Sequence, residues 1–280
     1  MDNNSSDQTR EVVEDFCGKY PGRFRYLLEP NQGVSYARNT GIRESRGEVV
    51  AFMDDDVTVE QEWLWSLTAC LLSGEWAGVG GRIIPVWECS APNWLSVSGP
   101  HSFGPFVAFD RGLEAGQLSE PPFGANMAFR REVFEKYGYF RTDLGRSGSN
   151  LLSNEDTEFG RRLLAGGERL RYEPSAVMHH PVTENRLQKS YLLAWWLAKG
   201  KADAMEMGIS KETRWLLAGI PLRLYRSLAV WTLRWLTAVD SKKRFSDKLN
   251  VWNLAGQIVG CYQVSGRTRM GKRAFIEHRH

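Results

Sequence analysis

Apolar positions along the first two thirds of the chain follow two different spacings. A spacing of three to four residues predicts helices over 7–19, 35–47, 60–74, 125–138 and 154–167. In the first of these, Val12, Val13 and Phe16 share one face. Short β-rich runs predict strands over 23–29, 48–53, within 76–87, and over 169–182, where Pro174 is expected to break the strand. Strands that alternate with helices indicate an α/β fold with a mostly parallel sheet flanked by helices.

The chain after residue 187 is predicted to be mostly helical, and one of its helices is strongly two-sided. Over 221–239, with Pro221 in the first turn, the polar positions fall within about 100° of arc, and the remaining arc is largely Leu, Trp, Ala and Val. This pattern is typical of a helix that lies in a membrane interface with arginines near anionic headgroups. A helix that packs on the catalytic domain is the alternative. The polar positions are Arg223, Arg226, Ser227, Arg234 and Thr237.

Charge is divided unevenly along the chain. Of the net charge of +3, residues 1–185 contribute −9 and residues 186–280 contribute +12. Six of the eleven tryptophans lie between 195 and 252, which favours a lipid surface over nucleic acid as the partner of the basic part. We therefore expect a catalytic domain over 1–185 and a basic, Trp-rich helical extension over 186–280 that associates with a membrane.

Compartment signals agree with this expectation. The first ten residues are polar and do not resemble a signal peptide. No apolar run approaches the roughly 20 residues of a membrane-spanning helix. The four cysteines contain no Cys-x-x-Cys pair, so neither a zinc site nor a disulfide framework is indicated. These features predict a cytoplasmic protein bound peripherally to the inner face of the plasma membrane.

Three consecutive aspartates, Asp54, Asp55 and Asp56, follow the predicted strand 48–53. Ligands of α/β proteins gather beyond the carboxyl ends of strands. Adjacent carboxylates repel one another unless a cation neutralises them, and hard oxygen ligands suit Mg²⁺ or Mn²⁺. Taken alone, the triplet is equally consistent with a solvated acidic turn in which Asp56 or Thr58 caps the next helix.

Five segments that occur in a fixed order favour the metal site over the acidic turn. They read NQGVSYARNTGI, GEVVAFMDDD, FGANMAFRREVFEKYGYF, NEDTEFGRRLLAGG and YEPSAVMHH. Together, from residue 1 to about residue 183, they resemble the family 2 glycosyltransferases, which have the GT-A fold. The resemblance implies inverting transfer of a sugar from a nucleotide-diphosphate donor, with a UDP-sugar as the first candidate, to a hydroxyl acceptor. That acceptor would belong to a polysaccharide, the cell wall or a lipid-linked glycan.

The resemblance also assigns roles to residues. Asp54, Asp56 and His180 match positions that hold Mg²⁺ or Mn²⁺, while Asp156 matches the base that removes the acceptor proton and Glu155 a neighbour that positions a sugar. The positions that match contacts to the nucleotide sugar are Asp2, Asn3, Arg38, Asn39, Asp54, Asp55, Gly124, Ala125, Asn126 and Arg162. Without the resemblance, Glu155 and Asp156 would be interpreted as acidic residues that complement a helix dipole, and Arg162 equally well as half of a structural ion pair.

Two departures leave alternatives open. Family members place a strand, a helix and a second strand before the segment that resembles residues 1–7, so we expect the GT-A-like sheet to be incomplete at the N-terminus. An inactive, membrane-associated fragment is therefore one alternative, and a metal-dependent phosphohydrolase or phosphotransferase is another. Residues 88–122 and 140–153 are expected to determine specificity.

Overall fold

A computed structural model describes residues 1–97, 101, 104–209 and 215–277, with side chains up to residue 265. Parts of the predicted specificity loop 88–122 and of the extension 186–280 thus lie outside the described residues. The chain divides into two units. The first comprises 1–84, 109–150 and 155–179, and the second comprises 85–108, 151–154 and 180–280. The division falls inside one strand, between His179 and His180.

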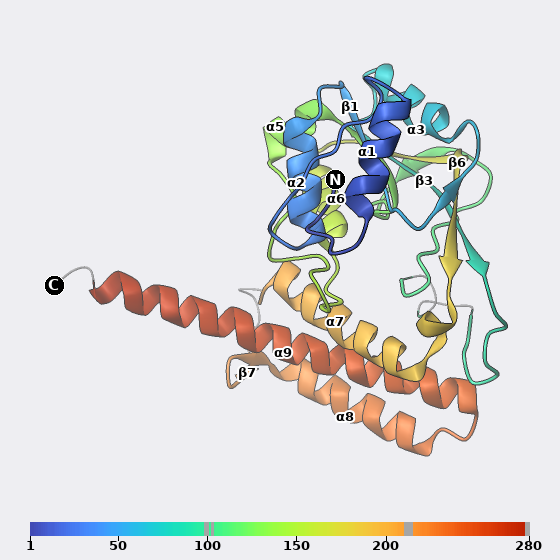
Figure 1. Ribbon diagram of the computed structural model, residues 1–280. Coiled ribbons are helices and arrows are strands. Elements are labelled where there is room, and N and C mark those ends of the chain that lie inside the picture. The colour runs from blue at the N-terminus through green and yellow to red at the C-terminus, as the bar shows by residue number, and fades with distance from the viewer. Residues whose placement is uncertain (98–100, 102–103, 210–214, 278–280) are drawn as a thin grey trace. The chain divides into compact units, whose positions relative to one another are not determined.

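The first unit is built on a sheet whose main path has the order β1-β5-β3-β6-β2, with β4 paired to β6 (Figure 1). The strands are β1 (Val49–Met53), β2 (Thr58–Val59), β3 (Gly78–Trp87), β4 (Gly116–Leu118), β5 (Asn126–Arg130) and β6 (Leu170–Val182). The α/β prediction is confirmed. The prediction of a mostly parallel sheet is wrong, because β5 pairs antiparallel with both β1 and β3, and β2 and β4 pair antiparallel with β6.

The insertion of β5 explains this error. Because β1 and β3 are both antiparallel to β5, they run in the same direction, as the strand-helix-strand pattern indicated, but they are not neighbours. The sequence pattern indicates the connection from β1 through α3 (Trp63–Leu72) to β3. It gives no sign that β5, which comes later in the chain, lies between β1 and β3 in the sheet.

The predicted helix over 125–138 is a strand followed by a helix, β5 and then α5 (Arg131–Tyr137). β5 has a strand on each side, and its first four residues are buried, which indicates that both faces of the sheet are covered there. Pro174 does not break β6. It lies between the stretch paired with β4, which ends at Tyr172, and the stretch paired with β2, which begins at Met178, so no bond to those strands requires its missing N–H.

Helices flank this sheet, and an aromatic core packs two of them, α5 and α6 (Glu155–Ala165), against β5. The helices are α1 (Thr9–Lys19), α2 (Val34–Glu44), α3, α5 and α6. Phe159 of α6 lies with its ring centroid 5.2 Å from Phe129 of β5, 5.0 Å from Phe134 of α5 and 4.9 Å from Phe140. This packing sets the start of α6 against the end of the sheet that carries the aspartates.

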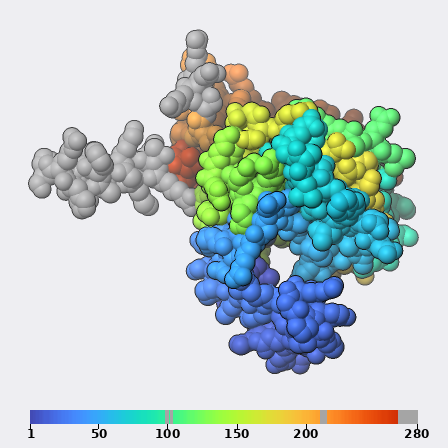
Figure 2. All heavy atoms as spheres, turned by 90° about the horizontal axis from the view of Figure 1, so that it is seen from above, coloured from blue at the N-terminus to red at the C-terminus, as the bar shows by residue number. Residues whose placement is uncertain are grey.

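Segment 1–30 is packed differently from its prediction. α1 forms, but none of its residues is buried, and Val12 and Phe16 are 53% and 43% exposed. The predicted strand 23–29 is reduced to a single parallel bridge between Asp2 and Leu28. Figure 2 shows an open hollow between these N-terminal residues, in the darkest blue, and the lighter-blue segments.

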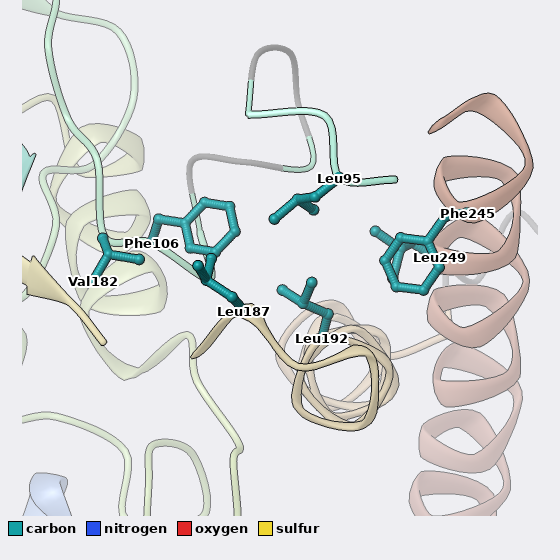
Figure 3. Close-up of a cluster of buried hydrophobic side chains, with 7 residues drawn as sticks. All are labelled: Leu95, Phe106, Val182, Leu187, Leu192, Phe245 and Leu249. Carbon is teal, nitrogen blue, oxygen red and sulfur yellow. The ribbon is translucent and has the colours of Figure 1, made fainter. Parts of the chain in front are cut away.

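The second unit is mostly helical. It contains β7 (Leu216–Leu217), β8 (Ile220–Pro221), η1 (Glu184–Leu187), α7 (Lys189–Met207), α8 (Leu222–Thr237) and α9 (Ser241–Glu277) (Figure 1). α7 and α9 meet backbone to backbone, since a Cβ on Gly200 would lie 1.9 Å from the carbonyl oxygen of Asn253 and one on Gly256 would lie 2.0 Å from that of Leu197. An apolar cluster packs Leu95 and Phe106 against side chains of this helical unit (Figure 3), and its members are Leu95, Phe106, Val182, Leu187, Leu192, Phe245 and Leu249.

α8 is the least covered of the long helices of this unit. Leu224 is its one buried residue, and Val230, Leu233 and Leu236 are 56%, 64% and 62% exposed. Within the described part of the chain, no helix combines the length and apolarity needed to cross a bilayer.

Candidate active site

The aspartate triplet follows the end of β1, as predicted. Asp54 is partly buried, and Asp55 and Asp56 are exposed. Two residues later β2 pairs with β6, with Thr58 opposite His179, so β6 places the next residue, His180, beside the triplet. The ligand atoms of Asp54, Asp56 and His180 all lie within 4.8 Å of one another. Two ligands of one Mg²⁺ or Mn²⁺ lie up to about 4.2 Å apart at bond lengths of about 2.1 Å, so a small side-chain adjustment brings this group to a metal's spacing.

Arg38 of α2 connects the triplet to α6. Its Nη1 donates to Glu155 Oε1 at 2.7 Å, and its Nη2 lies 3.8 Å from Asp54 Oδ1. Its side chain is 11% exposed. Burial alone would lower the pKa of Arg38, but Glu155, Asp156 and Asp54 together raise it, so the guanidinium stays charged among three carboxylates. Two motifs more than a hundred residues apart therefore share one cation.

Gly124 completes this arrangement. Its backbone N–H donates to Asp156 Oδ2 at 2.6 Å, and its carbonyl oxygen accepts from Arg38 Nη2 at 3.3 Å. Asp156 Oδ1 accepts from the backbone N–H of Thr157 at 2.7 Å and from its hydroxyl at 3.2 Å. The carboxylate of Asp156 is thus held in one orientation from two sides.

Glu155 is a buried acid with an altered proton affinity. Burial, followed by the negative charge of Asp156, raises the pKa of Glu155 to about 7, against the opposing charge of Arg38. Near neutral pH Glu155 can therefore exchange a proton.

Comparison with known proteins shows that the chain is similar to glycosyltransferases. Residues 1–138 match the family model of glycosyl transferase family 2. Over this segment the chain is similar to the family 2 glycosyltransferases. Over 199 residues the chain is 31% identical to the succinoglycan biosynthesis protein ExoM of Rhizobium meliloti, and over 207 residues it is 29% identical to the glucosyl-dolichyl phosphate glucuronosyltransferase of Haloferax volcanii. The matches cover 71% and 72% of this chain but 59% and 64% of those relatives.

Solved structures show the same fold for this chain. GalNAc-T7 with UDP, GalNAc and Mn²⁺ superposes with a TM-score of 0.53 over 89% of this chain and 47% of its own, at 14% identity. The mannosyltransferase PcManGT from Pyrobaculum calidifontis, in complex with GDP-Man and Mn²⁺, has a TM-score of 0.52, covers 98% and 69%, and is 17% identical. The GT-A fold predicted from the five segments is confirmed.

Other predicted contact residues are buried and contact protein groups. Asn39 is buried, and its amide exchanges hydrogen bonds of 2.8 and 3.0 Å with the backbone of Phe140. Asn126 is fully buried, accepts from Trp63 Nε1 at 2.9 Å, and donates to the carbonyl oxygens of Arg82 and Ala176. Ala125, between Gly124 and Asn126, is also buried. In the sequence these residues directly follow Arg38 and Gly124.

The two predicted contact residues at the N-terminus are also held by protein groups. Hydrogen bonds from the Tyr26 hydroxyl and then from Ser5 lower the pKa of Asp2. Asn3 Oδ1 accepts from the backbone N–H of Gly33 at 2.6 Å, immediately before α2 begins. Asn3 therefore helps to fix the segment that leads to Arg38.

Arg162 forms a structural ion pair, which is one of the two roles that its sequence position predicted. Its guanidinium pairs with Glu158 at 2.5 Å and donates to the carbonyl oxygens of Tyr137 and Tyr139. It joins α6 to the end of α5, about two helical turns from Glu155.

Asn154 is a residue that sequence reasoning did not single out. It is buried, directly precedes Glu155, and has a positive φ of 78°. Its Nδ2 donates to Asp203 and Glu206 of α7 at 2.8 and 2.6 Å, and Lys199 donates to its Oδ1 at 2.9 Å. An asparagine before an acidic first helical turn is a signal for a left-handed residue, but its partners lie some 50 residues away and carry no motif.

Proposed function

We propose that this chain is a family 2 glycosyltransferase that transfers a sugar from a nucleotide-diphosphate donor to a hydroxyl acceptor, with inversion at the anomeric carbon. The observation that carries the proposal is the position of Arg38, which lies 3.8 Å from Asp54 and 2.7 Å from Glu155. A donor diphosphate held at the triplet then has the Glu155–Asp156 pair beside its sugar, which is where an acceptor must be deprotonated.

Asp54, Asp56 and His180 are the residues that would hold Mg²⁺ or Mn²⁺. Two carboxylates and an imidazole are a suitable donor set for either ion, and the structures of both solved neighbours contain Mn²⁺. The ion supplies charge neutralisation to the departing diphosphate. Arg38 adds a fixed positive charge on the same side, which draws an anionic donor toward the triplet.

Asp156 is the proposed base. A carboxylate oxygen accepts two hydrogen bonds, and in the described part of the chain Gly124 is the donor to Oδ2, so the second position suits an acceptor hydroxyl. As that hydroxyl oxygen attacks the anomeric carbon, its proton passes to Asp156 and the bond to the diphosphate breaks. Glu155 anchors Arg38 and sets the charge around Asp156.

The proposed acceptor is a lipid-linked or polysaccharide hydroxyl at a membrane surface. One relative acts by its name on glucosyl-dolichyl phosphate. In this chain, the exposed Leu233 and Leu236 on α8, with Arg226 and Arg234 on the same helix, suit an interfacial position. We accordingly propose that the basic part, 186–280, lies on the inner face of the plasma membrane and that residues 1–185 carry out the transfer.

Calorimetric titration of the whole chain with UDP- and GDP-sugars tests donor binding. Binding should require Mn²⁺ or Mg²⁺ and should be lost in Asp56→Asn. Asp15→Asn, which removes an exposed carboxylate on α1, is the matched control. Metal-independent binding, or hydrolysis of p-nitrophenyl phosphate without any nucleotide sugar, would overturn the proposal in favour of a phosphohydrolase.

Transfer is tested separately with a panel of glycosylated polyprenyl phosphates and polysaccharides. Asp156→Asn should retain donor binding and lose transfer. The anomeric configuration of the product, measured by NMR, should be opposite to that of the donor, and retention would contradict a single displacement.

A further inference from the structure

A pocket with a volume of about 310 Å³ lies in the second unit, between the last turns of α8 and the first turns of α9. Its walls combine aromatic and cationic groups, namely Trp231, Phe245, Arg234, Lys242 and Lys243. This pocket does not include any residue of the triplet or of the Glu155–Asp156 pair.

The cations of the pocket are placed to meet an anion. The Arg234 guanidinium lies 4.2 Å from the centroid of the Trp231 ring, which restricts its orientation. Lys242 and Lys243 are exposed and lie in the first turn of α9, whose positive dipole end adds to their charge. Asp240 caps that turn by accepting from the backbone N–H of Lys243 at 2.8 Å.

Asp247 lies one turn further along α9 and also lines the pocket. It is 3% exposed, and its Oδ2 is buried without a hydrogen-bond partner in the described part of the chain. The neighbouring His101 is already engaged with Ser246 and Asn250, at 3.2 Å each. A buried carboxylate oxygen without a donor costs stability until a donor reaches it.

These two features together select the ligand. A bare phosphate would be attracted by Arg234, Lys242 and Lys243 but repelled by Asp247. A phosphodiester that also carries a hydroxyl or ammonium donor satisfies both, with its phosphate on the cations and its donor on Asp247. A lipid headgroup has this chemistry, and apolar surface for its chains adjoins it.

That apolar surface belongs to a second pocket, of about 370 Å³, which shares Arg234, Lys243 and Asp247 with the first. It is lined by Val239, which is 99% exposed. Leu236 of α8, three residues earlier in the chain, is 62% exposed. Apolar residues this exposed beside a cationic pocket suit the boundary between headgroups and acyl chains.

We propose that the first pocket, hereafter the headgroup pocket, binds the headgroup of a phospholipid that carries a hydroxyl or ammonium donor. Its phosphate lies on Arg234, Lys242 and Lys243, and its donor reaches Asp247. The proposal rests on the membrane association proposed above and makes it specific for headgroup chemistry.

Sedimentation with vesicles tests this with the whole chain. The protein should bind phosphatidylcholine vesicles weakly and vesicles that also contain phosphatidylglycerol more tightly. Lys242→Gln with Lys243→Gln should weaken the latter binding about 30-fold. Arg10→Gln with Lys19→Gln, which removes two exposed cations from α1, is the control and should change it far less.

Asp247→Asn distinguishes the headgroup pocket from general electrostatic attraction. Removal of a negative charge strengthens nonspecific binding to anionic vesicles, whereas loss of the carboxylate that receives the headgroup donor should weaken it about tenfold. Tighter binding of this variant would overturn the proposal. So would competition by inorganic phosphate that equals competition by glycerophosphoglycerol, since it would assign the pocket to phosphate.

Should Asp247→Asn fail to fold, hydrogen exchange of the unaltered protein provides the same test. Residues 231–250 should gain protection on phosphatidylglycerol vesicles relative to phosphatidylcholine, and equal protection would overturn the proposal. If the protein kept its binding to phosphatidylcholine vesicles but lost its dependence on the headgroup, the headgroup pocket would be overturned and the membrane association would stand. Calorimetric titration with the nucleotide sugar tests the transferase site independently of both.

Discussion

The backbone N–H of Gly124 donates a 2.6 Å hydrogen bond to Oδ2 of Asp156. No side chain fits between them, because a Cβ on Gly124 would lie 2.9 Å from that oxygen and 2.7 Å from Nη2 of Arg38. The glycine therefore sets the position of both charged groups, and the proposed base depends on a residue that has no functional group of its own.

Gly124→Ala should displace Asp156 and Arg38 and lower kcat about a hundredfold, because small misplacements of reacting groups have effects of this size. The displaced atoms are the ends of flexible side chains, so the free energy of unfolding should change by no more than about 1 kcal/mol. Steady-state kinetics and urea unfolding measure the two effects. Gly116→Ala, where a Cβ meets nothing within 4 Å, is the matched control. Equal kinetics in the two variants would contradict this role of Gly124.

The raised pKa of Glu155 makes stability depend on pH. Between its ordinary value of 4.5 and about 7, the folded protein binds a proton at Glu155 that the unfolded chain has released. The free energy of unfolding should therefore fall as pH rises through this window, by roughly 3 kcal/mol, and then level off. Urea unfolding at several pH values measures the slope.

Glu155→Gln should flatten that slope, since the amide does not titrate, while it keeps an oxygen for Arg38. Glu135→Gln, on the exposed side of α5, should leave the slope unchanged. A slope that persists in Glu155→Gln would show that another group is responsible.

Metal affinity should depend on Asp56 and His180 and much less on Asp55. Asp56→Asn and His180→Gln should each weaken Mn²⁺ binding by at least about tenfold, because each removes a ligand from the group with Asp54. Asp55→Asn removes the same charge from the same turn as Asp56→Asn and serves as its control. Calorimetry with Mn²⁺ alone measures all three. Similar losses in Asp55→Asn and Asp56→Asn would indicate general attraction to an acidic turn.

Asn154 should contribute to stability out of proportion to its size. Asn154→Ala places alanine at a φ of 78° and removes the donor to Asp203 and Glu206, so it should lower the free energy of unfolding by about 3 kcal/mol. Asn154→Gly relieves the backbone strain and should lower it by about 2 kcal/mol. Asn4→Ala, at an exposed residue with a φ of 62°, measures strain without the network. If Asn4→Ala and Asn154→Ala had equal effects on urea unfolding, the hydrogen bonds between Asn154 and α7 would make no net contribution to the free energy of unfolding.

Local pattern and resemblance predicted different parts of this molecule. Helix signals located α2 and α6 to within a few residues, and the apolar run before Asp54 located β1. The order of five motifs identified the GT-A fold. The antiparallel insertion of β5 was missed because pairing between β1 and β5 joins residues about 77 apart, from Val49↔Arg130 to Met53↔Asn126, and leaves no periodic trace.

The site shows the same limit. The resemblance pointed to Arg38 and Glu155, which the structure brings together, but it did not distinguish groups that face a ligand from groups that hold the scaffold. Asn126 and Arg162 occupy motif positions, yet both make strong hydrogen bonds or ion pairs with protein groups in the described part of the chain. Hydrogen-bond satisfaction of a buried amide depends on three other segments of the chain and is not encoded near the residue itself.

The exposed leucines of α8 provide a test of membrane association that is independent of headgroup charge. Leu233→Ser with Leu236→Ser should weaken binding to phosphatidylcholine vesicles by about 30-fold or more, because each exposed leucine that enters the interface contributes more than 1 kcal/mol. Both side chains are more than 60% exposed, so urea unfolding should be unchanged. Leu64→Ser with Leu72→Ser, at 54% and 61% exposure on α3, alters surface apolarity equally and should leave vesicle binding intact. Equal losses in the two double variants would show that α8 is not the membrane-facing surface.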